Sequence, residues 1–179
     1  MFRNIRFYRF DGSWPASEEK LSESLEKAGF KPCGPLTERS SGWVAVDKDT
    51  SDSLARRVNG ADLFRLRSQS RVLPHSVVNE ELEARIEAYR ERMQEAPSPR
   101  EKRRLKAEAR DELMPKAMRK SDRIWGYVDL AESILCIDAA QDAAAERFVR
   151  RLQASVDGLN IRPLQYMQPV EELLSGIFF

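Results

Sequence analysis

The chain has 179 residues, of which 33% are charged and 41% hydrophobic, and its formal net charge is +1. This composition is typical of a globular protein of one domain with room for an inserted subdomain, and it argues against a disordered chain. No apolar run reaches the roughly 20 residues of a membrane-spanning helix, and the first residues lack the apolar core of a signal peptide, so we expect a cytoplasmic protein. The chain has only two cysteines, Cys33 and Cys136, which are far apart in the sequence, and one histidine, His75. We therefore expect no Cys/His metal cluster.

The first 58 residues predict two strands and two helices. Residues 2–10 alternate well enough to form a strand with apolar side chains on both faces, which favours a central place in a sheet. Ser17 can cap a helix that Gly29 ends. Residues 42–46 indicate a short strand, and a brief helix is expected over residues 52–58.

Residues 63–73 predict a strand with one apolar and one polar face. Asn59 and Gly60 precede it as a turn or a helix stop. Alternation places two apolar residues on one face and mostly cations on the other: Phe64 and Leu66 against Arg65, Arg67, Gln69 and Arg71. Such a face is usually the water-facing side of an antiparallel sheet, and the alternative is that it contributes to binding an anion.

Residues 76–121 predict an antiparallel helical hairpin. Its first helix begins at Ser76 or Asn79 and its second begins with a capping box, in which Ser98 is the N-cap and Glu101 reaches back to it. Pro115 has no amide hydrogen, so the second helix should bend or restart near Met114. The seam between the two helices is apolar and consists of Leu82, Ile86, Tyr89 and Met93 against Leu105, Ala109 and Leu113.

The second helix sorts its charges by side. A turn of 100° per residue places three carboxylates on one flank of the apolar strip and three cations on the other: Glu101, Glu108 and Glu112, and Arg103, Lys106 and Arg110. Residues 100–123 hold ten Lys/Arg against five Asp/Glu, a local charge of +5, so the rest of the chain carries −4. Positive potential is thus concentrated as expected for a surface that meets a polyanion. The alternative is a solvated hairpin that contacts nothing in particular.

The last third predicts a β-hairpin and a helix. Residues 124–140 form two strands around a turn at 131–133, Asp138 can cap a long helix, and residues 161–164 read as a final strand. The expected fold is α+β: a mixed or antiparallel sheet with packed helices and an inserted antiparallel helical hairpin. We expect residues 1–75 and 122–179 to form a central body and residues 76–121 to form a tip.

Catalytic signatures are weak. The best carboxylate set for a magnesium-dependent nuclease is Asp129, Glu132, Asp138 and Asp142, but Asp138 is better explained as an N-cap and Glu132 as a turn residue. His75 follows a proline and is interpreted as a loop residue and not as a general base. We therefore predict no catalytic residue, no metal ligand and no cofactor, which means that the protein is not an enzyme.

Several short segments, in register over nearly the whole chain, resemble the bacterial recombination-associated protein RdgC family. None of them is a catalytic signature, but their order and spacing together are specific. They are residues 4–9, residues 30–34, Gly42-Trp43-Val44, Asn59-Gly60, Val72-Leu73-Pro74, Leu82-Glu83-Ala84, residues 113–117, Trp125 with Asp129, and Ala145-Glu146.

The resemblance implies a DNA-binding protein without enzymatic activity. Family members are expected to form a two-subunit ring around duplex DNA, to bind single- and double-stranded DNA with little sequence preference, to associate with the nucleoid and to restrain the RecA recombinase. Two features of this chain depart from that pattern: the family's chains continue well past position 179, and Met118 stands where the family can carry an aromatic that joins the two tips. A homodimer held by the tips alone, or a monomer, is therefore expected.

The leading hypothesis is sequence-independent DNA binding through phosphate contacts. The expected DNA contacts are Arg100, Lys102, Arg103, Arg104, Lys106, Arg110, Lys116, Arg119, Lys120 and Arg123 of the tip region, with Arg65, Arg67 and Arg71 on the strand; the expected dimer contacts are Leu113, Met114 and Met118. The alternative hypothesis is a protein-interaction module of the recombination machinery in which the cations only give solubility.

Overall fold

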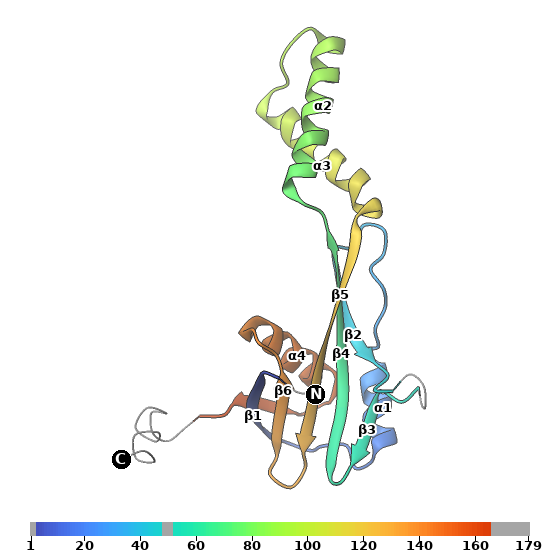
Figure 1. The fold of residues 1–179 in the computed structure, drawn as a ribbon, viewed down its shortest axis with the longest axis vertical. Helices are drawn as coiled ribbons and strands as arrows, with labels where there is room; N and C mark the ends of the chain where they lie inside the picture. The colour runs from blue at the N-terminus through green and yellow to red at the C-terminus, as the bar shows by residue number, and fades with distance from the viewer. Residues whose placement is uncertain (1–2, 48–51, 166–179) are drawn as a thin grey trace, which may run out of the picture. The chain divides into compact units, whose positions relative to one another are not determined.

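The computed structural model describes residues 3–47 and 52–165 (Figure 1). Within these residues the chain forms seven strands, four α-helices and a short 3₁₀ helix, which confirms the predicted α+β class. In chain order they are β1 (Ile5–Asp11), α1 (Glu18–Glu26), β2 (Arg39–Val44), β3 (Ala55–Val58), β4 (Ala61–Val72), α2 (His75–Met93), α3 (Pro99–Leu113), η1 (Met114–Lys116), β5 (Met118–Asp129), β6 (Ile134–Asp138), α4 (Asp142–Ser155) and β7 (Asn160–Pro163).

The seven strands form one sheet in the order β2-β4-β5-β6-β1-β7, with β3 paired to β4. β1 runs antiparallel to both of its neighbours, β6 and β7, so it is an interior strand one position from the edge of the sheet, although Ile5 and Phe7 remain exposed. The chain divides into two compact units. We call residues 1–29, 43–66 and 124–179 the sheet unit, and residues 30–42 and 67–123 the hairpin unit.

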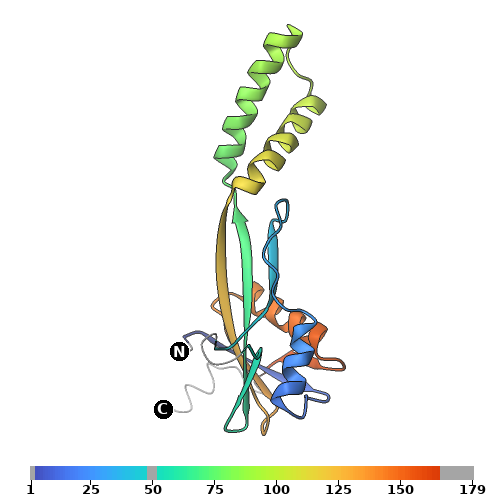
Figure 2. The ribbon, with the colours of Figure 1, turned by 90° about the vertical axis from the view of Figure 1, so that its right-hand side faces the viewer.

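The core of the sheet unit lies between its sheet and two helices. Figure 2 shows α1 and α4 on the same side of the sheet. Trp43, Phe64 and Phe148 are at most 1% exposed, and their ring centroids lie 5.2 to 5.6 Å apart. Gly126 lies against this cluster, because a Cβ atom there would come within 2.3 Å of the Phe148 ring. Close packing of this kind leaves position 126 no room for a side chain.

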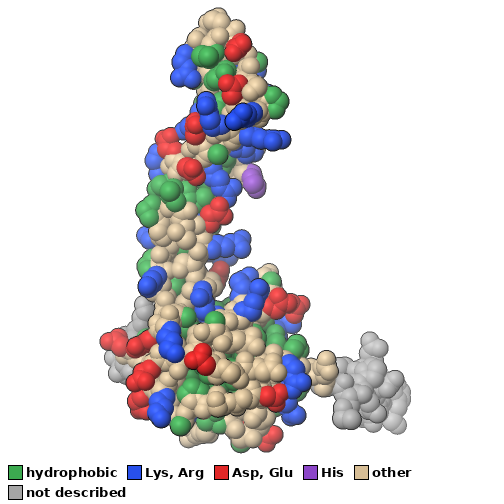
Figure 3. All heavy atoms as spheres, turned by 180° about the vertical axis from the view of Figure 1, so that it is seen from behind, with side chains coloured by type: hydrophobic (Ala, Val, Ile, Leu, Met, Phe, Trp, Pro, Cys, Tyr) green, Lys and Arg blue, Asp and Glu red, His purple; other side chains and the backbone are tan. Residues whose placement is uncertain are grey.

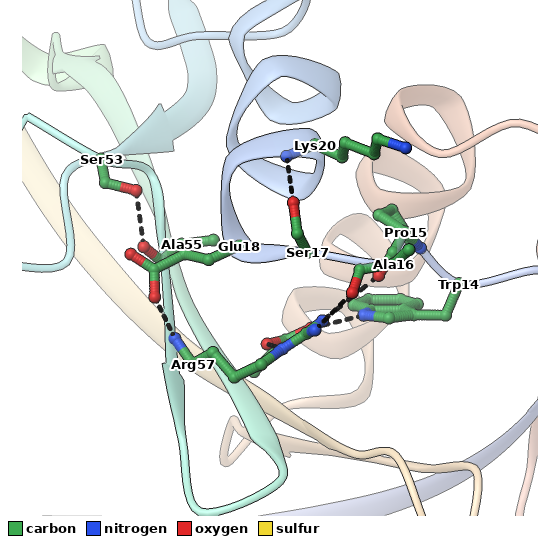
Figure 4. A network of polar contacts seen from close by, with 10 residues as sticks. Trp14, Pro15, Ala16, Ser17, Glu18, Lys20, Ser53, Ala55 and Arg57 are labelled. Atoms are coloured by element: carbon green, nitrogen blue, oxygen red, sulfur yellow. Dashed lines mark hydrogen bonds and ion pairs between the residues drawn. The ribbon is translucent and has the colours of Figure 1, made fainter.

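A buried ion pair also holds the sheet unit together (Figure 4). The Asp62 side chain is fully buried, and its two oxygens accept hydrogen bonds from Arg57 Nε at 2.6 Å and Arg57 Nη2 at 2.7 Å. Trp14 Nε1 donates to the same carboxylate at 2.6 Å, and Arg57 Nη1 donates to the Ala16 carbonyl at 2.7 Å. The hydrogen bonds to Asp62 raise the pKa of Arg57 above its ordinary value. A buried charge is tolerated when its hydrogen bonds are satisfied in this way.

The helix expected over residues 52–58 is wrong. Ala55–Val58 is instead the strand β3, which pairs antiparallel with β4, so that Val58 lies opposite Ala61. Asn59 and Gly60 have positive φ angles of 49° and 82°, as a two-residue hairpin turn requires. This segment is too short to have a strong structural preference of its own, so its pairing with β4 determines its conformation.

The role expected for Asp138 is also wrong. Its carboxylate accepts hydrogen bonds from the backbone amides of Arg3 at 3.1 Å and Asn4 at 2.9 Å. The helix α4 begins at Asp142 with Gln141 as its N-cap, and no side chain caps it. Asp138 thus fixes the beginning of the chain to the end of β6.

Candidate nucleic-acid interface

The helices α2 and α3 lie side by side and antiparallel, as predicted (Figure 1). The predicted capping box is present: Ser98 Oγ accepts from the Glu101 amide at 3.3 Å, and Glu101 Oε2 accepts from the Ser98 amide at 2.9 Å. Tyr89 of α2 donates its hydroxyl to Glu101 Oε1 at 2.6 Å. The hydrogen bond from Tyr89, followed by those from Ser98, lowers the pKa of Glu101 to about 2. One carboxylate therefore fixes the start of α3 and its contact with α2.

Arg85 makes a second polar contact between the two helices. It donates to Glu81 of its own helix at 2.9 Å and to Glu112 of α3 at 2.5 Å, and the bond from Arg85 lowers the pKa of Glu112. The apolar seam is narrower than expected. Leu105 and Ala109 are buried, as predicted, but Met93 is 49% exposed. Polar contacts therefore accompany a short apolar seam between the two helices.

The ten cations of residues 100–123 are all exposed. The side chains of five of them make no hydrogen bond or ion pair with any described residue: Arg100, Lys102, Arg103, Arg119 and Arg123. The last two lie on β5 and not on a helix, because the strand already begins at Met118. An exposed cation without a partner keeps its charge available to an anion.

The other five cations of this segment have partners in their own chain. Four face a carboxylate: Arg104 with Glu108 at 3.5 Å, Lys116 with Glu112 at 3.6 Å, Lys120 with Asp122 at 3.8 Å, and Arg110 with Glu38. Lys106 Nζ instead donates to Asn79 Oδ1 at 3.1 Å. Exposed pairs of this kind contribute little energy, so an incoming anion can displace them.

Three of the predicted cations line one hollow. Arg103, Lys106 and Arg110, which the helical spacing placed on one flank of α3, surround a space of about 280 Å³ together with Leu73, His75, Val78 and Ala107. Figure 3 shows the histidine side chain among lysine and arginine side chains of the hairpin unit. The spacing of the cations identified the flank, but nothing in the sequence placed His75 beside residues about 30 positions later.

The three cations predicted on the strand β4, Arg65, Arg67 and Arg71, contact other residues of their own chain. Arg71 donates to four backbone carbonyls, those of Gly34, Met114, Pro115 and Ala117, at 2.9 to 3.4 Å. Its guanidinium therefore secures the turn after α3.

Arg67 and Arg65 are also engaged. Arg67 lies over the Phe30 ring at 4.5 Å and donates to Ser121 Oγ at 3.1 Å. Arg65 lies over the Trp125 ring at 4.8 Å and donates to the Ala45 carbonyl at 2.5 Å. All three strand arginines are half-buried, so their first role is packing.

The three residues expected at a dimer contact differ in exposure. Met114 is only 4% exposed and Leu113 is half-buried, whereas Met118 is 81% exposed. An apolar contact with a second molecule at this place would therefore depend mainly on Met118.

Three of the four carboxylates considered for metal binding, those of Asp129, Asp138 and Asp142, have other partners. Asp129 Oδ1 accepts from the amides of Ala131 at 3.0 Å and Glu132 at 3.2 Å, and Asp142 pairs with Arg6. Among residues 3–47 and 52–165, no three His, Cys, Asp or Glu side chains are grouped so that they could hold a metal ion. Over the same residues, no helix combines the length and apolar character that crossing a bilayer requires.

These features define an α+β protein with a helical hairpin that carries a cationic flank on α3. The chain belongs to the RdgC family: the family model described as "Putative exonuclease, RdgC" matches residues 1–176. Proteins called recombination-associated protein RdgC are 31% identical in Sodalis glossinidius, 29% in Yersinia enterocolitica and 28% in Serratia proteamaculans. Each alignment covers 174 residues, which is 97% of this chain and 57% of the relative. The chain thus spans little more than half the length of these curated relatives.

Proposed function

We propose that this protein binds DNA without sequence preference, through phosphate contacts on the basic side of the α2–α3 hairpin. The observation that carries the proposal is the convergence of Arg103, Lys106 and Arg110 on one hollow, with further exposed cations around them that have no partner among the described residues. Lysine and arginine suit this role because each contact with a phosphate releases condensed counterions. The segment offers no pattern for reading base edges, so the expected binding is non-specific.

The salt dependence of binding tests this proposal. Replacement of Arg103, Lys106 and Arg110 together by alanine should weaken binding to unrelated duplexes alike and flatten the plot of log affinity against log salt by about three units. Fluorescence anisotropy of a labelled random duplex, titrated at several salt concentrations, measures both effects. Unchanged affinity and slope would exclude this flank of the hairpin as the DNA contact.

A matched variant separates a local contact from net charge. Replacement of Arg104, Lys116 and Lys120 by alanine removes the same formal charge, but each of these cations already faces a carboxylate. We expect a smaller change of slope from this variant, because the neighbouring carboxylates already reduce the potential there. An equal effect of the two triple variants would mean that only overall charge matters.

The names of the relatives support a role in recombination, and we extend that role to this chain. Binding of both single- and double-stranded DNA would place it on the nucleoid, where it would compete with the RecA recombinase for DNA. A strand-exchange assay with purified RecA, with and without this protein, tests the competition. The triple variant at Arg103, Lys106 and Arg110 should inhibit less than the unaltered chain.

The proposed activity is binding without cleavage, which differs from the exonuclease wording of the family model. Asp129 and Asp138 already accept hydrogen bonds from backbone amides. They also lie apart, because Asp129 of β5 is opposite the first residue of β6, whereas Asp138 is the last residue of β6. Incubation of end-labelled DNA with the protein and magnesium should leave the DNA intact. Release of labelled nucleotides that disappears in Asp129→Asn would overturn this part of the proposal.

A second candidate function is protein interaction, including association with a second copy. Exposed apolar side chains on the hairpin unit favour it: Met118, Met93, Val72 and Val77. This candidate predicts partner capture by the unaltered chain and no salt-sensitive DNA binding, so the anisotropy experiment distinguishes the two functions.

A further inference from the structure

The hollow beside α3 has the chemistry of an anion site that is more selective than a basic surface. Its rim carries Arg103, Lys106 and Arg110, and its wall is apolar where Leu73, Val78 and Ala107 contribute. A flat cationic face can contact a continuous phosphate backbone along its length, whereas a hollow can enclose a group that stands at the end of a strand. The volume of about 280 Å³ leaves room for a phosphate with its attached sugar.

The charges around the hollow favour an anion with more than one negative charge. Three cations face it, and the one carboxylate that contacts any of them is Glu38, which pairs with Arg110, as far as the described residues show. Arg103 has no partner among the described residues, and Lys106 is bonded only to the neutral Asn79. A phosphodiester carries one negative charge, but a phosphate monoester carries nearly two at neutral pH.

The N-terminus of α2 adds to the positive potential in the hollow. α2 begins at His75, has no side-chain cap and has no acidic residue in its first turn. His75 and Val78, from this first turn, line the hollow. The amides at a helix start carry partial positive charge, which here is not offset by a carboxylate of the same turn.

We propose that this hollow binds a phosphate monoester, with Arg103 and Lys106 as the main contacts and Arg110 released from Glu38 to join them. The proposal rests on the proposed function and deepens it, because it assigns the flank of α3 to terminal phosphates and not to phosphodiesters alone. Two sources offer this group: the 5′ end of a DNA strand and a free mononucleotide. The sugar next to the phosphate would lie against Leu73 and Val78.

Paired oligonucleotides test the inference. Anisotropy titrations of the full chain should use one labelled single strand with either a 5′ phosphate or a 5′ hydroxyl group. We expect about a tenfold tighter binding of the phosphorylated strand, in line with one or two charge-assisted hydrogen bonds. The preference should vanish in Arg103→Ala and in Lys106→Ala. It should persist in Arg92→Ala, which removes an exposed cation of α2 outside the hollow.

Free ligands separate the two sources. Titration with dAMP, followed by calorimetry, should show binding that Arg103→Ala abolishes if mononucleotides enter the hollow. If only the phosphorylated oligonucleotide shows the preference, the DNA end is the ligand. Thermal melting followed by circular dichroism checks that each variant folds. Arg103→Ala should leave the fold intact, because no described residue forms a hydrogen bond or ion pair with the Arg103 side chain.

The outcomes also separate this inference from the proposed function. Equal binding of both oligonucleotides overturns the monoester site and leaves DNA binding intact. A preference that survives in both Arg103→Ala and Lys106→Ala overturns the assignment to this hollow. Binding of dAMP without any binding of DNA would support the site and overturn the proposed function.

Discussion

The sheet unit and the hairpin unit are held together by different interactions. In the sheet unit, the rings of Trp43, Phe64 and Phe148 are almost completely buried, and its one fully buried carboxylate among the described residues, Asp62, is matched by Arg57. In the hairpin, Tyr89 and Arg85 contact α3 through carboxylates that lie at or near the surface. Apolar burial is the larger source of stability, and exposed ion pairs add little.

This difference teaches where the chain can vary its surface without losing its fold. The exposed side of α3 makes few tertiary contacts, so this helix can carry six cations within its 15 residues, because none of them is needed for a core. The sheet unit has no such freedom at Arg57 or Gly126. We therefore expect substitutions in the sheet unit to change stability and substitutions on α3 to change binding.

The largest effect on stability is expected from Arg57→Ala. This substitution leaves the Asp62 carboxylate fully buried without its cation, and breaking a buried pair costs roughly 3–5 kcal/mol. Urea unfolding followed by tryptophan fluorescence reports on the sheet unit, which contains all three tryptophans, Trp14, Trp43 and Trp125. The matched control is Arg56→Ala, which removes an exposed pair with Asp47 at 3.8 Å and should cost less than about 1 kcal/mol. Equal losses in both variants would contradict the role given to the buried pair.

A smaller loss is expected from Gly126→Ala. The added methyl group would come within 2.3 Å of Phe148, so the ring must move or the strand must shift. Overpacking of a dense core costs about 1–3 kcal/mol. The midpoint of urea unfolding should fall without a change of slope. A midpoint equal to that of the unaltered chain would show that the core around Phe148 is looser than the structure indicates.

The hairpin should respond to acid through Glu101. Its pKa is lowered from 4.5 to about 2 in the folded chain, so the carboxylate stabilises the fold above its ordinary pKa, and this contribution is lost as the pH falls through about 2. In Tyr89→Phe, the largest cause of the shift is removed. We expect the titration of Glu101 to move toward pH 4.5 and the folded state to lose stability at neutral pH.

The Tyr89 experiment is measured by NMR titration of the side-chain carboxyl groups, together with circular dichroism at 222 nm. The conservative control is Tyr8→Phe, since Tyr8 belongs to the sheet unit and does not contact Glu101. If Glu101 titrates at the same pH with and without the Tyr89 hydroxyl, the capping box alone accounts for its low pKa.

Features that depend on neighbouring residues could be predicted from the sequence. The capping box at Ser98, the apolar strip of Leu105 and Ala109, and the cationic flank of α3 all follow from spacing within one helix, and the structure contains each of them. The turn at Asn59 and Gly60 was also expected, although as a helix stop or turn of unspecified type. Local rules succeed where one element determines the outcome.

Features that depend on distant partners could not be predicted in this way. Arg71 looked like a binding residue because it alternates with apolar positions, but it binds carbonyls of residues 34 and 114–117. Asp138 looked like a helix cap, but it binds amides more than 130 positions earlier. His75 joins the hollow only because α2 and α3 fold back on one another. In each case the partner is chosen by tertiary structure.

The smallest effect on stability is expected at Met118, where the proposed self-association can be separated from folding. Its side chain is 81% exposed, so Met118→Asp should change the free energy of unfolding by no more than about 0.5 kcal/mol. A charge at the centre of an apolar contact between two copies would, however, weaken that contact. We expect sedimentation velocity at rising concentration to show weak self-association of the unaltered chain that Met118→Asp removes.

The matched variant for this experiment is Met93→Asp, since Met93 is also an exposed methionine of the hairpin unit, 49% exposed, but lies at the other end of α2 from its junction with β4. It should leave sedimentation unchanged. A tight dimer that survives Met118→Asp would place the contact elsewhere on the chain, and a chain that stays monomeric at every concentration would remove self-association from the proposed function. Because DNA binding by the hairpin needs only its cations, neither result would affect the salt dependence expected for Arg103, Lys106 and Arg110.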